Sequence, residues 1–210
     1  MAKIPLVING APLTLIRSRR RRRTVSISIK HPGQILVRAP HRVPEHDVAS
    51  FIQKREVWIQ NRLRRCQEAL DFQSKLRQEE TWPFLGQATA RPTAPNAKKW
   101  YRRQAAAYLK QRTEILATKM GLDAPPIKID SAKRRWGACN AKNILCFPWR
   151  LMMLPPEIID YIVAHELAHI KEKHHGPGFW RFALTAVPSL ASGRRWLRDH
   201  QHLYADLFHE

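Results

Sequence analysis

Residues 161–180 read YIVAHELAHIKEKHHGPGFW, a stretch that contains four of the ten histidines of the chain. His165 and His169 are four positions apart, so on a helix they lie one turn apart on the same face. Glu166 follows the first histidine and completes the pattern HExxH. In this pattern two imidazoles bind one zinc ion, and the glutamate can reach a metal-bound water without being a ligand. The stretch therefore predicts a zinc site on a helix.

The residues before the motif favour a metal site over the polar face of an ordinary helix. Residues 154–164 read LPPEIIDYIVA, which is mostly apolar and places prolines where the first turn of a helix tolerates them. Such a helix is expected to be buried, and unpaired polar groups on it would be destabilising. A helix with a purely structural role would carry Leu or Ala at these positions.

A zinc site with an open coordination position needs a third protein ligand, and ligand geometry favours His175. This histidine lies ten residues after His165, beyond the expected end of the helix, where the chain can turn back towards the metal. The alternatives are the adjacent His174 and the downstream carboxylates of Asp199 and Asp206.

The spacing of the three histidines equals that of the metzincin signature HExxHxxGxxH, but Glu172 stands at the glycine position. The sharp turn that glycine allows is therefore absent, which argues against a metzincin. Glu172 also shares the helical phase of His165 and His169, but it lies about 10 Å along the axis from His165. One straight helix cannot bring it to the same ion.

The charge of the chain is extreme, with 37 basic and 17 acidic residues and a formal net charge of +20. Arg17 and Arg19 to Arg23 supply six positive charges within seven residues. This run predicts weak electrostatic binding to nucleic acid, although it also fits a solvated loop. Aromatic residues are not interleaved with it, so a dedicated nucleic-acid reader is not indicated.

The remaining composition indicates a cytoplasmic protein without a membrane partner. No run of 18 apolar residues is present. Three cysteines and no CxxC pattern give no sign of a disulfide framework, which fits a reducing compartment.

The periodicity of the chain predicts an α+β fold. Alternating apolar residues over 13–39 predict a β-hairpin that turns at Pro32 and Gly33, and a helical pattern follows from Pro44. Later segments predict a helix from about residue 98 to 120, two short strands with a turn near 140–143, and three further helices. We therefore expect a β-rich segment with one helix over 1–76, a Pro-rich linker over 77–97 and a hydrolase domain over 98–210.

The sequence RRWGACNAKNILCFPWRLMMLPPEIIDYIVAHELAHIKEKHHGPGFW, which begins at Arg134, resembles the YgjP-like metallopeptidase family. The resemblance rests on an RWGxC segment, a WRL segment, the HELAH helix and a following histidine before FW. It implies a zincin-like core with a short antiparallel sheet, one zinc ion on His165, His169 and His175, and Glu166 as the catalyst.

Four further residues are candidates for contact with substrate or for orienting the metal ligands: Arg135, Trp136, Arg150 and Tyr161. The chain also departs from the family pattern at three places. Ala138 replaces a serine, Pro148 replaces an asparagine, and the Pro-rich piece over 77–97 stands where the family has a strand pair.

The leading hypothesis is a zinc metallopeptidase in which zinc-activated water attacks a peptide carbonyl with Glu166 as general base, acting on peptides or unfolded proteins. A strand over about 144–149 could align the peptide. One alternative is a metal-dependent nucleoside triphosphate pyrophosphatase whose arginines compensate phosphate charge. Another is a basic nucleic-acid-associated module with a mainly structural metal.

Overall fold

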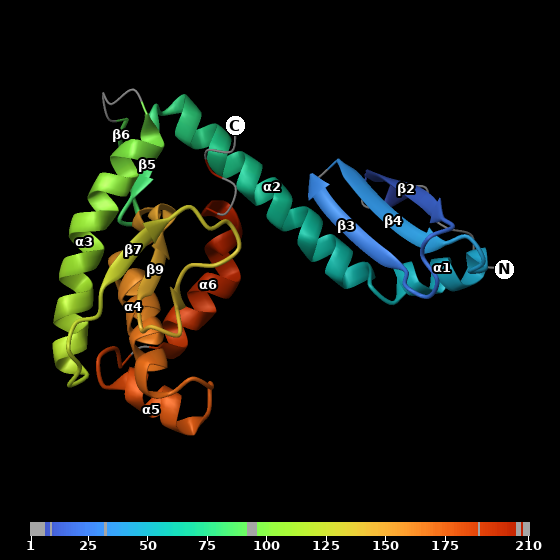
Figure 1. Cartoon of the computed structure of the whole chain (residues 1–210). Coiled ribbons are helices and arrows are strands. Elements are labelled where there is room, and N and C mark those ends of the chain that lie inside the picture. The colour runs from blue at the N-terminus through green and yellow to red at the C-terminus, as the bar shows by residue number, and fades with distance from the viewer. Residues whose placement is uncertain are drawn as a thin grey trace. The chain divides into compact units, whose positions relative to one another are not determined.

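The computed structural model describes residues 7–8, 10–31, 33–91, 96–188, 190–204 and 207. The chain divides into two compact units, Met1–Phe72 and Gln73–Glu210. In chain order (Figure 1), the elements are β1 (Val7–Ile8), β2 (Ala11–Ser18), β3 (Ser26–His31), β4 (Gln34–Pro40), α1 (Glu45–Gln53), α2 (Glu56–Gln78), β5 (Thr81–Phe84), β6 (Gln87–Ala90), α3 (Ala97–Lys119), β7 (Ile127–Asp130), β8 (Ala138–Cys139), β9 (Leu145–Pro148), the 3-10 helix η1 (Trp149–Met153), α4 (Pro156–Lys171), α5 (Pro177–Leu184) and α6 (Leu190–Tyr204). This mixed content confirms the α+β class.

The first unit contains a four-stranded sheet with the strand order β1-β2-β4-β3. Strands β3 and β4 form an antiparallel hairpin, as the alternating pattern predicted, although the predicted turn residue Pro32 lies outside the described residues. Strand β2 runs parallel to β4, with Leu13 opposite Ile35. Periodicity does not reveal this parallel pair, because each strand shows the same two-residue period whichever way its neighbour runs.

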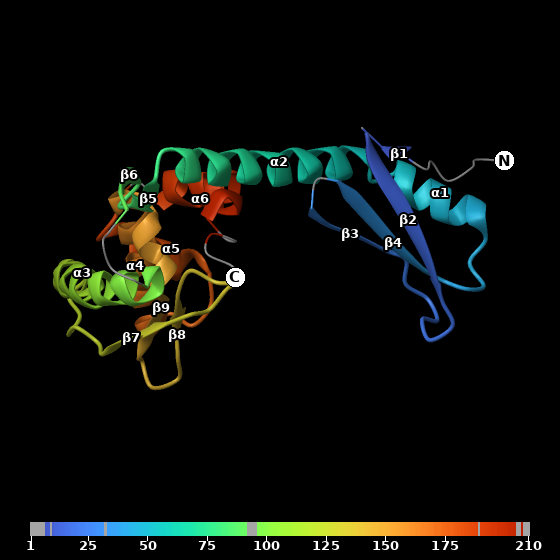
Figure 2. The same cartoon turned by 90° about the horizontal axis from the view of Figure 1, so that it is seen from above.

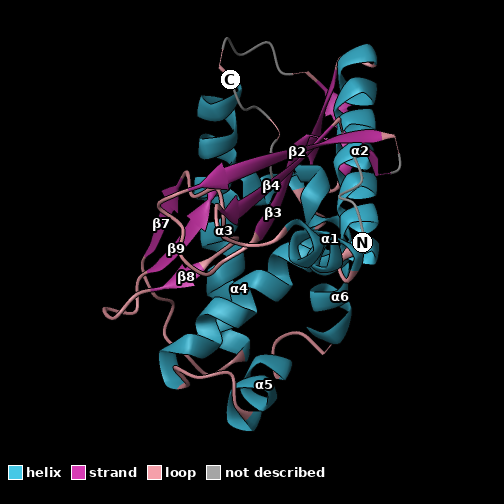
Figure 3. Ribbon diagram, turned by 90° about the vertical axis from the view of Figure 1, so that its right-hand side faces the viewer, coloured by secondary structure: helices cyan, strands magenta, loops and turns pink. Residues whose placement is uncertain are grey.

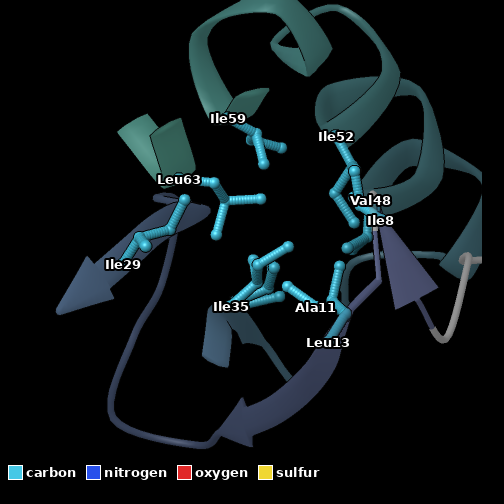
Figure 4. Close-up of a cluster of buried hydrophobic side chains, with 11 residues drawn as sticks. Ile8, Ala11, Leu13, Ile29, Ile35, Val48, Ile52, Ile59 and Leu63 are labelled. Carbon is cyan, nitrogen blue, oxygen red and sulfur yellow. The ribbon is translucent and has the colours of Figure 1, made fainter. Parts of the chain in front are cut away.

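Helices α1 and α2 cover one face of this sheet (Figure 2). Their apolar residues Val48, Ile52 and Ile59 meet the buried strand residues Ile35 and Val37, and Figure 4 shows this cluster. Each large aliphatic side chain buried here contributes roughly 1.5–3 kcal/mol to folding. The continuous helical pattern after Pro44 is divided into two helices, since Lys54 and Arg55 form a turn between α1 and α2.

The range predicted as a linker contains a β-hairpin, which corrects that prediction. Strands β5 and β6 pair antiparallel across a turn in which Leu85 and Gly86 have φ of 50° and 78°. Trp82 of β5 is buried and stacks on Tyr101 of α3, with ring centroids 5.8 Å apart. Strands of only four residues, one of which contains Pro83, show no sustained period, so the sequence pattern did not predict them. The hairpin also supplies a strand pair where we expected the chain to lack one.

Helix α3 packs against α4 in the second unit and follows its predicted range closely. Asn96 caps its first turn by accepting a hydrogen bond from the backbone N–H of Lys99, and Gly121 follows its end with φ of 62°. Arg112 of α3 donates two hydrogen bonds to the Asp160 carboxylate of α4, at 2.7 and 2.6 Å.

Strands β7, β9 and β8 form a small sheet with β9 in the centre. Strand β8 is antiparallel to β9, as expected, but β7 is parallel to it, so the sheet is mixed. The predicted turn lies between β8 and β9, where the Asn140 side chain accepts hydrogen bonds from the backbone N–H groups of Lys142 and Ile144. Pro148 stands at the end of β9, beyond its pairing with β8, so its missing N–H is tolerated.

Helix α4 lies beside this sheet (Figure 3) and contacts α3, α5, α6 and β8. Gly193 of α6 allows a close approach to α4, since a Cβ atom at this position would lie 2.5 Å from the Tyr161 ring. Within the part of the chain that the structure describes, no helix combines the length and apolar character needed to cross a membrane.

Candidate metal centre

Helix α4 presents the first two histidines from a largely buried position. Pro155 caps the helix and Pro156 occupies its first turn, where its missing N–H loses no helical hydrogen bond. Most residues of the helix are buried, including Ile162, Val163 and Leu167. The rings of His165 and His169 lie one turn apart on the same side of the helix, with centroids separated by 5.1 Å.

The chain after α4 turns back and brings His175 to the same place. Its Nε2 atom lies 3.0 Å from Nε2 of His165, and its ring centroid lies 4.8 Å from that of His169. One nitrogen from each of the three rings lies within 4.8 Å of the others. Trp180 of α5 fixes the backbone of this turn by donating a hydrogen bond from Nε1 to the His175 carbonyl at 3.1 Å.

The three imidazoles fit a zinc ion. Tetrahedral zinc with Zn–N bonds of about 2.0–2.1 Å places two ligating nitrogens about 3.3–3.4 Å apart, close to the separation between His165 and His175. His169 can donate from Nδ1 to the Glu172 carbonyl at 3.1 Å, which leaves its Nε2 lone pair free for a metal. Glu172 thus takes part through its backbone oxygen, which its helical phase in the sequence did not reveal.

The ring of Phe179 packs against the rings of all three histidines. Its fully buried ring lies 4.9 Å from the ring of His165 and 4.7 Å from the rings of His169 and His175, measured between centroids. Because α5 begins directly after the returning turn, this aromatic residue restricts the orientation of every ring in the cluster. The sequence alone does not distinguish a core role for Phe179 from contact with the three histidines.

Burial favours the neutral form of His165 and His169, which is the form that binds a metal. Burial, together with the neighbouring His169 and His175, lowers the pKa of His165 to about 4. Burial also lowers the pKa of His169, whereas its hydrogen bond with Glu172 raises it. Neutral imidazoles at neutral pH are the donor set that zinc requires.

Glu166 is buried beside the histidines, with only 7% of its surface exposed. The pKa of its carboxyl group is raised to about 7. Burial raises it, and this effect outweighs the positive charge of Arg135 and a hydrogen bond from the Cys139 backbone, both of which lower it. Gly137 makes room for this carboxylate, since a Cβ atom there would lie 2.6 Å from Oε1 of Glu166. The loop before β8 and the strand itself therefore surround Glu166 on the side away from α4.

A pocket opens beside His165 and Glu166. It is lined by residues of α4, α6 and the loop before β8: Trp136, Gly137, Tyr161, Ile162, His165, Glu166 and Leu197. Trp136 donates a hydrogen bond from its indole N–H to the Gln201 side chain of α6 at 3.2 Å, which joins the two walls.

The family assignment follows from comparison with known proteins. The family described as YgjP-like, metallopeptidase domain, matches residues 23–97 and 92–200, which is most of the chain. The chain belongs to this family. The resemblance inferred from the sequence is thereby confirmed, and the family implies a divalent metal.

Two further comparisons add less. The crystal structure of the metallopeptidase zymogen of Pyrococcus abyssi abylysin aligns with 44% of this chain and 95% of that chain, at 23% identity and a TM-score of 0.41. None of the curated proteins compared matches the chain.

The other candidate residues of this YgjP-like chain have distinct surroundings. Trp136 and Tyr161 line the pocket, and Arg135 is exposed and donates to the Asp130 carboxylate at 2.6 Å. Arg150 is buried and donates to the Ala132 carbonyl, so its observed contact anchors the loop that carries Arg135 and Trp136. The structure thus gives Arg150 a contact within the fold rather than one with the histidines.

Two of the alternatives to His175 as third ligand, His174 and Asp199, are not in the cluster. His174 is exposed, and Asp199 accepts hydrogen bonds from its neighbour Arg198. Asp206 lies outside the described residues. Among the residues that the structure describes, the cluster suited to a metal consists of His165, His169 and His175.

Proposed function

We propose that this protein is a zinc-dependent peptidase with Glu166 as its general base. The observation that carries the proposal is a buried carboxylate adjoining a cluster of three imidazoles, at the edge of an open pocket. His165, His169 and His175 would hold the zinc ion, which would act as a Lewis acid and lower the pKa of a bound water. The family membership supports a peptide as the substrate.

Glu166 moves the proton in this mechanism. Its carboxylate accepts a proton from the attacking water and returns it to the amide nitrogen, which then leaves as an amine. The Cys139 backbone and Arg135 favour the charged form of the carboxyl group, and burial opposes them. Gly137 leaves the space in which the carboxylate can face the reacting atoms.

The edge of the small sheet suits an extended peptide. Strand β9 is bonded on both sides, to β7 and to β8, so the strand over 144–149 that we expected to align the substrate has no free edge along its paired residues. Strands β7 and β8 are the two edge strands of this sheet, and β8 is the one that contacts α4. We therefore assign peptide alignment by strand addition to β8. The apolar walls formed by Trp136, Ile162 and Leu197 then receive a substrate side chain.

The substitution Glu166→Gln tests the proposal. It removes the base but keeps the size of the side chain, so we expect peptide hydrolysis to fall by about 10²- to 10⁴-fold. Zinc content, measured by mass spectrometry of the native protein, should stay at the wild-type level. Glu157→Gln is the matched control, because Glu157 is an exposed residue in the first turn of the same helix. Equal product formation by the wild-type protein and Glu166→Gln would contradict the proposal.

The structure does not add support for nucleotide hydrolysis. The two arginines that the sequence offered as compensation for phosphate charge are engaged, Arg135 with Asp130 and Arg150 with Ala132. Incubation with the four nucleoside triphosphates, again with the Glu166→Gln control, separates this reaction from peptide hydrolysis.

A further inference from the structure

The first unit carries positive charge that its own sequence does not compensate. Residues 1–44 contain ten lysines and arginines and no aspartate or glutamate, and the first acidic residue of the chain is Glu45. The chain as a whole has 17 acidic residues for its 37 basic ones. Strands β2, β3 and β4 and the loop between β2 and β3 all lie within this acid-free segment.

Two arginines of the β2–β3 loop region hold the backbone in place. Arg17 donates from one guanidinium nitrogen to the carbonyls of Pro40 and Val43, at 3.1 and 2.5 Å. Arg21 donates to the Ser26 hydroxyl at 2.9 Å. These bonds tie the start of the loop to the end of β4 and to β3, so the loop is anchored at both sides.

The other four arginines of the same loop lie at the surface. Arg19, Arg20, Arg22 and Arg23 are exposed, and within the described part of the chain no ion pair involves them. We call them the loop arginines. An anchored loop with four unpaired guanidinium groups is a surface prepared for an anion, because the backbone that presents the charges is already ordered.

The sheet beside this loop offers further donors. Helices α1 and α2 cover the face that carries Leu13 and Ile35 (Figure 4). The residues that alternate with these along the strands lie on the opposite face. That opposite face presents Thr14, Ser28 and Arg38, the last of which lies 3.4 Å from the Ser28 hydroxyl. Hydroxyl and guanidinium groups are typical partners of phosphate oxygens.

We propose that the loop arginines and the adjoining sheet face bind the phosphate backbone of nucleic acid. Arginine suits this ligand because its planar fork binds a phosphate through two hydrogen bonds. Strands β2, β3 and β4 contain no Phe, Tyr or Trp, so the surface has neither a platform for base stacking nor an aromatic anchor for a membrane. Binding is therefore independent of base sequence. This activity goes beyond the proposed peptidase function and does not depend on the metal centre.

The test measures binding of the full-length protein to a short fluorescent DNA duplex between about 50 and 200 mM salt. In the test variant all four loop arginines are replaced by glutamine. We expect the slope of log affinity against log salt to fall in magnitude by about 3–4, since each phosphate contact contributes about 0.9. Affinity at the lowest salt should fall at least about tenfold.

A matched variant separates a local site from net charge. Lys98, Lys99, Arg103 and Lys119 are exposed residues of α3, and replacing all four by glutamine changes the net charge equally. We expect this variant to bind the duplex like the wild-type protein. Replacing the loop arginines by lysine keeps the charge and should retain most of the salt slope while weakening the affinity, which excludes misfolding as the cause of the loss.

Three results would overturn the proposal. The loop variant could bind the duplex as well as the wild-type protein, or the α3 variant could lose affinity to the same degree. The wild-type protein could also bind vesicles containing phosphatidylserine but not the duplex, which would identify an anionic membrane as the partner. Peptide hydrolysis is measured on the same samples with a short uncharged peptide, and we expect the loop variant to keep it.

Discussion

Gly137 determines where the Glu166 carboxylate can lie. A Cβ atom on residue 137 would be 2.6 Å from both Cγ and Oε1 of Glu166, a separation that side chains do not adopt. The sequence shows this glycine within the RWGxC segment but gives no reason for it, because its neighbour Glu166 is 29 positions further along the chain. Its role is visible only when β8 and α4 are placed together.

We expect Gly137→Ala to reduce peptide hydrolysis by about 10- to 100-fold, since displacing a catalytic group by about 1 Å can lower a rate by that much. The three histidines lie on the other side of Glu166, so zinc content should be unchanged. The measurement is kcat with a peptide substrate, together with metal analysis. Gly176→Ala serves as the control, because no atom lies within 4 Å of a Cβ built at Gly176. Equal activity of the two variants would show that Glu166 tolerates the crowding.

The residues of the site differ in how far the sequence could reveal them. His165, Glu166 and His169 are separated by fixed helical spacings, so a local pattern suffices to bring them together. His175 required the assumption that the chain turns back after α4, and the position of its ring supports that assumption. The contacts of Phe179 with three rings and of Glu172 through its carbonyl depend on the path of the turn, which no periodicity encodes.

At the scale of elements, the pair between Arg112 and Asp160 joins α3 to α4, the helix that carries His165 and His169. The side chains are 24% and 21% exposed and share two short hydrogen bonds. Asp160 pairs with Arg112, 48 positions earlier in the chain, and not with the nearer Arg150. When several arginines are available, distance along the chain does not identify which of them pairs with a given carboxylate.

A double-mutant cycle with Arg112→Ala and Asp160→Ala should give a coupling free energy of about 1 kcal/mol, at the upper end for exposed pairs because this one is bidentate and partly shielded from water. The free energy of unfolding is measured by urea denaturation of all four proteins. The exposed pair Arg198–Asp199 on α6 provides the comparison, for which we expect a coupling near zero. Equal coupling in the two cycles would mean that shielding contributes nothing.

Element type was more predictable than element pairing. The helices at 97–119, 156–171 and 177–184 follow from apolar spacing and from Pro or Gly at their ends. The first of them was predicted at about 98–120, close to its observed limits. The pairing of β2 with β4 and of β7 with β9 joins strands separated by other chain segments, so no local signal reports it. The hairpin of β5 and β6 was missed because its stability comes from Trp82 packing on α3.

At the scale of the whole molecule, the division at Phe72 and Gln73 lies within α2. The sequence placed the change of domain in the Pro-rich stretch that starts at residue 77, because proline and glycine are typical of linkers. Two of those residues, Pro83 in β5 and Gly86 in the turn, are part of a hairpin that belongs to the second unit. All three histidines of the cluster also lie in the second unit.

Removal of the metal should therefore destabilise the second unit selectively. Metal at about 1,000 times its Kd stabilises the state that binds it by about 4 kcal/mol, and a chelator abolishes this contribution. We expect hydrogen exchange, followed by mass spectrometry, to become faster in peptides covering α4 and α5 after chelation. Peptides that cover β4, which contains the buried Ile35 and Val37, act as the internal reference. Equal acceleration in both units, or none in either, would contradict the assignment of the metal to the second unit.

Because Gly193 has no side chain, the crossing of α6 over α4 is sensitive to the addition of a single methyl group at this position. Leu197 stands one turn further along α6, and Gln201 holds the indole of Trp136, so a wedge between the helices would shift one side of the pocket. His169 and His175 lie outside that crossing and would stay in place. A natural substitution at this crossing would thus change the peptide selectivity of the proposed peptidase by altering the packing of α6 on α4. The residues that line the pocket would themselves be unchanged.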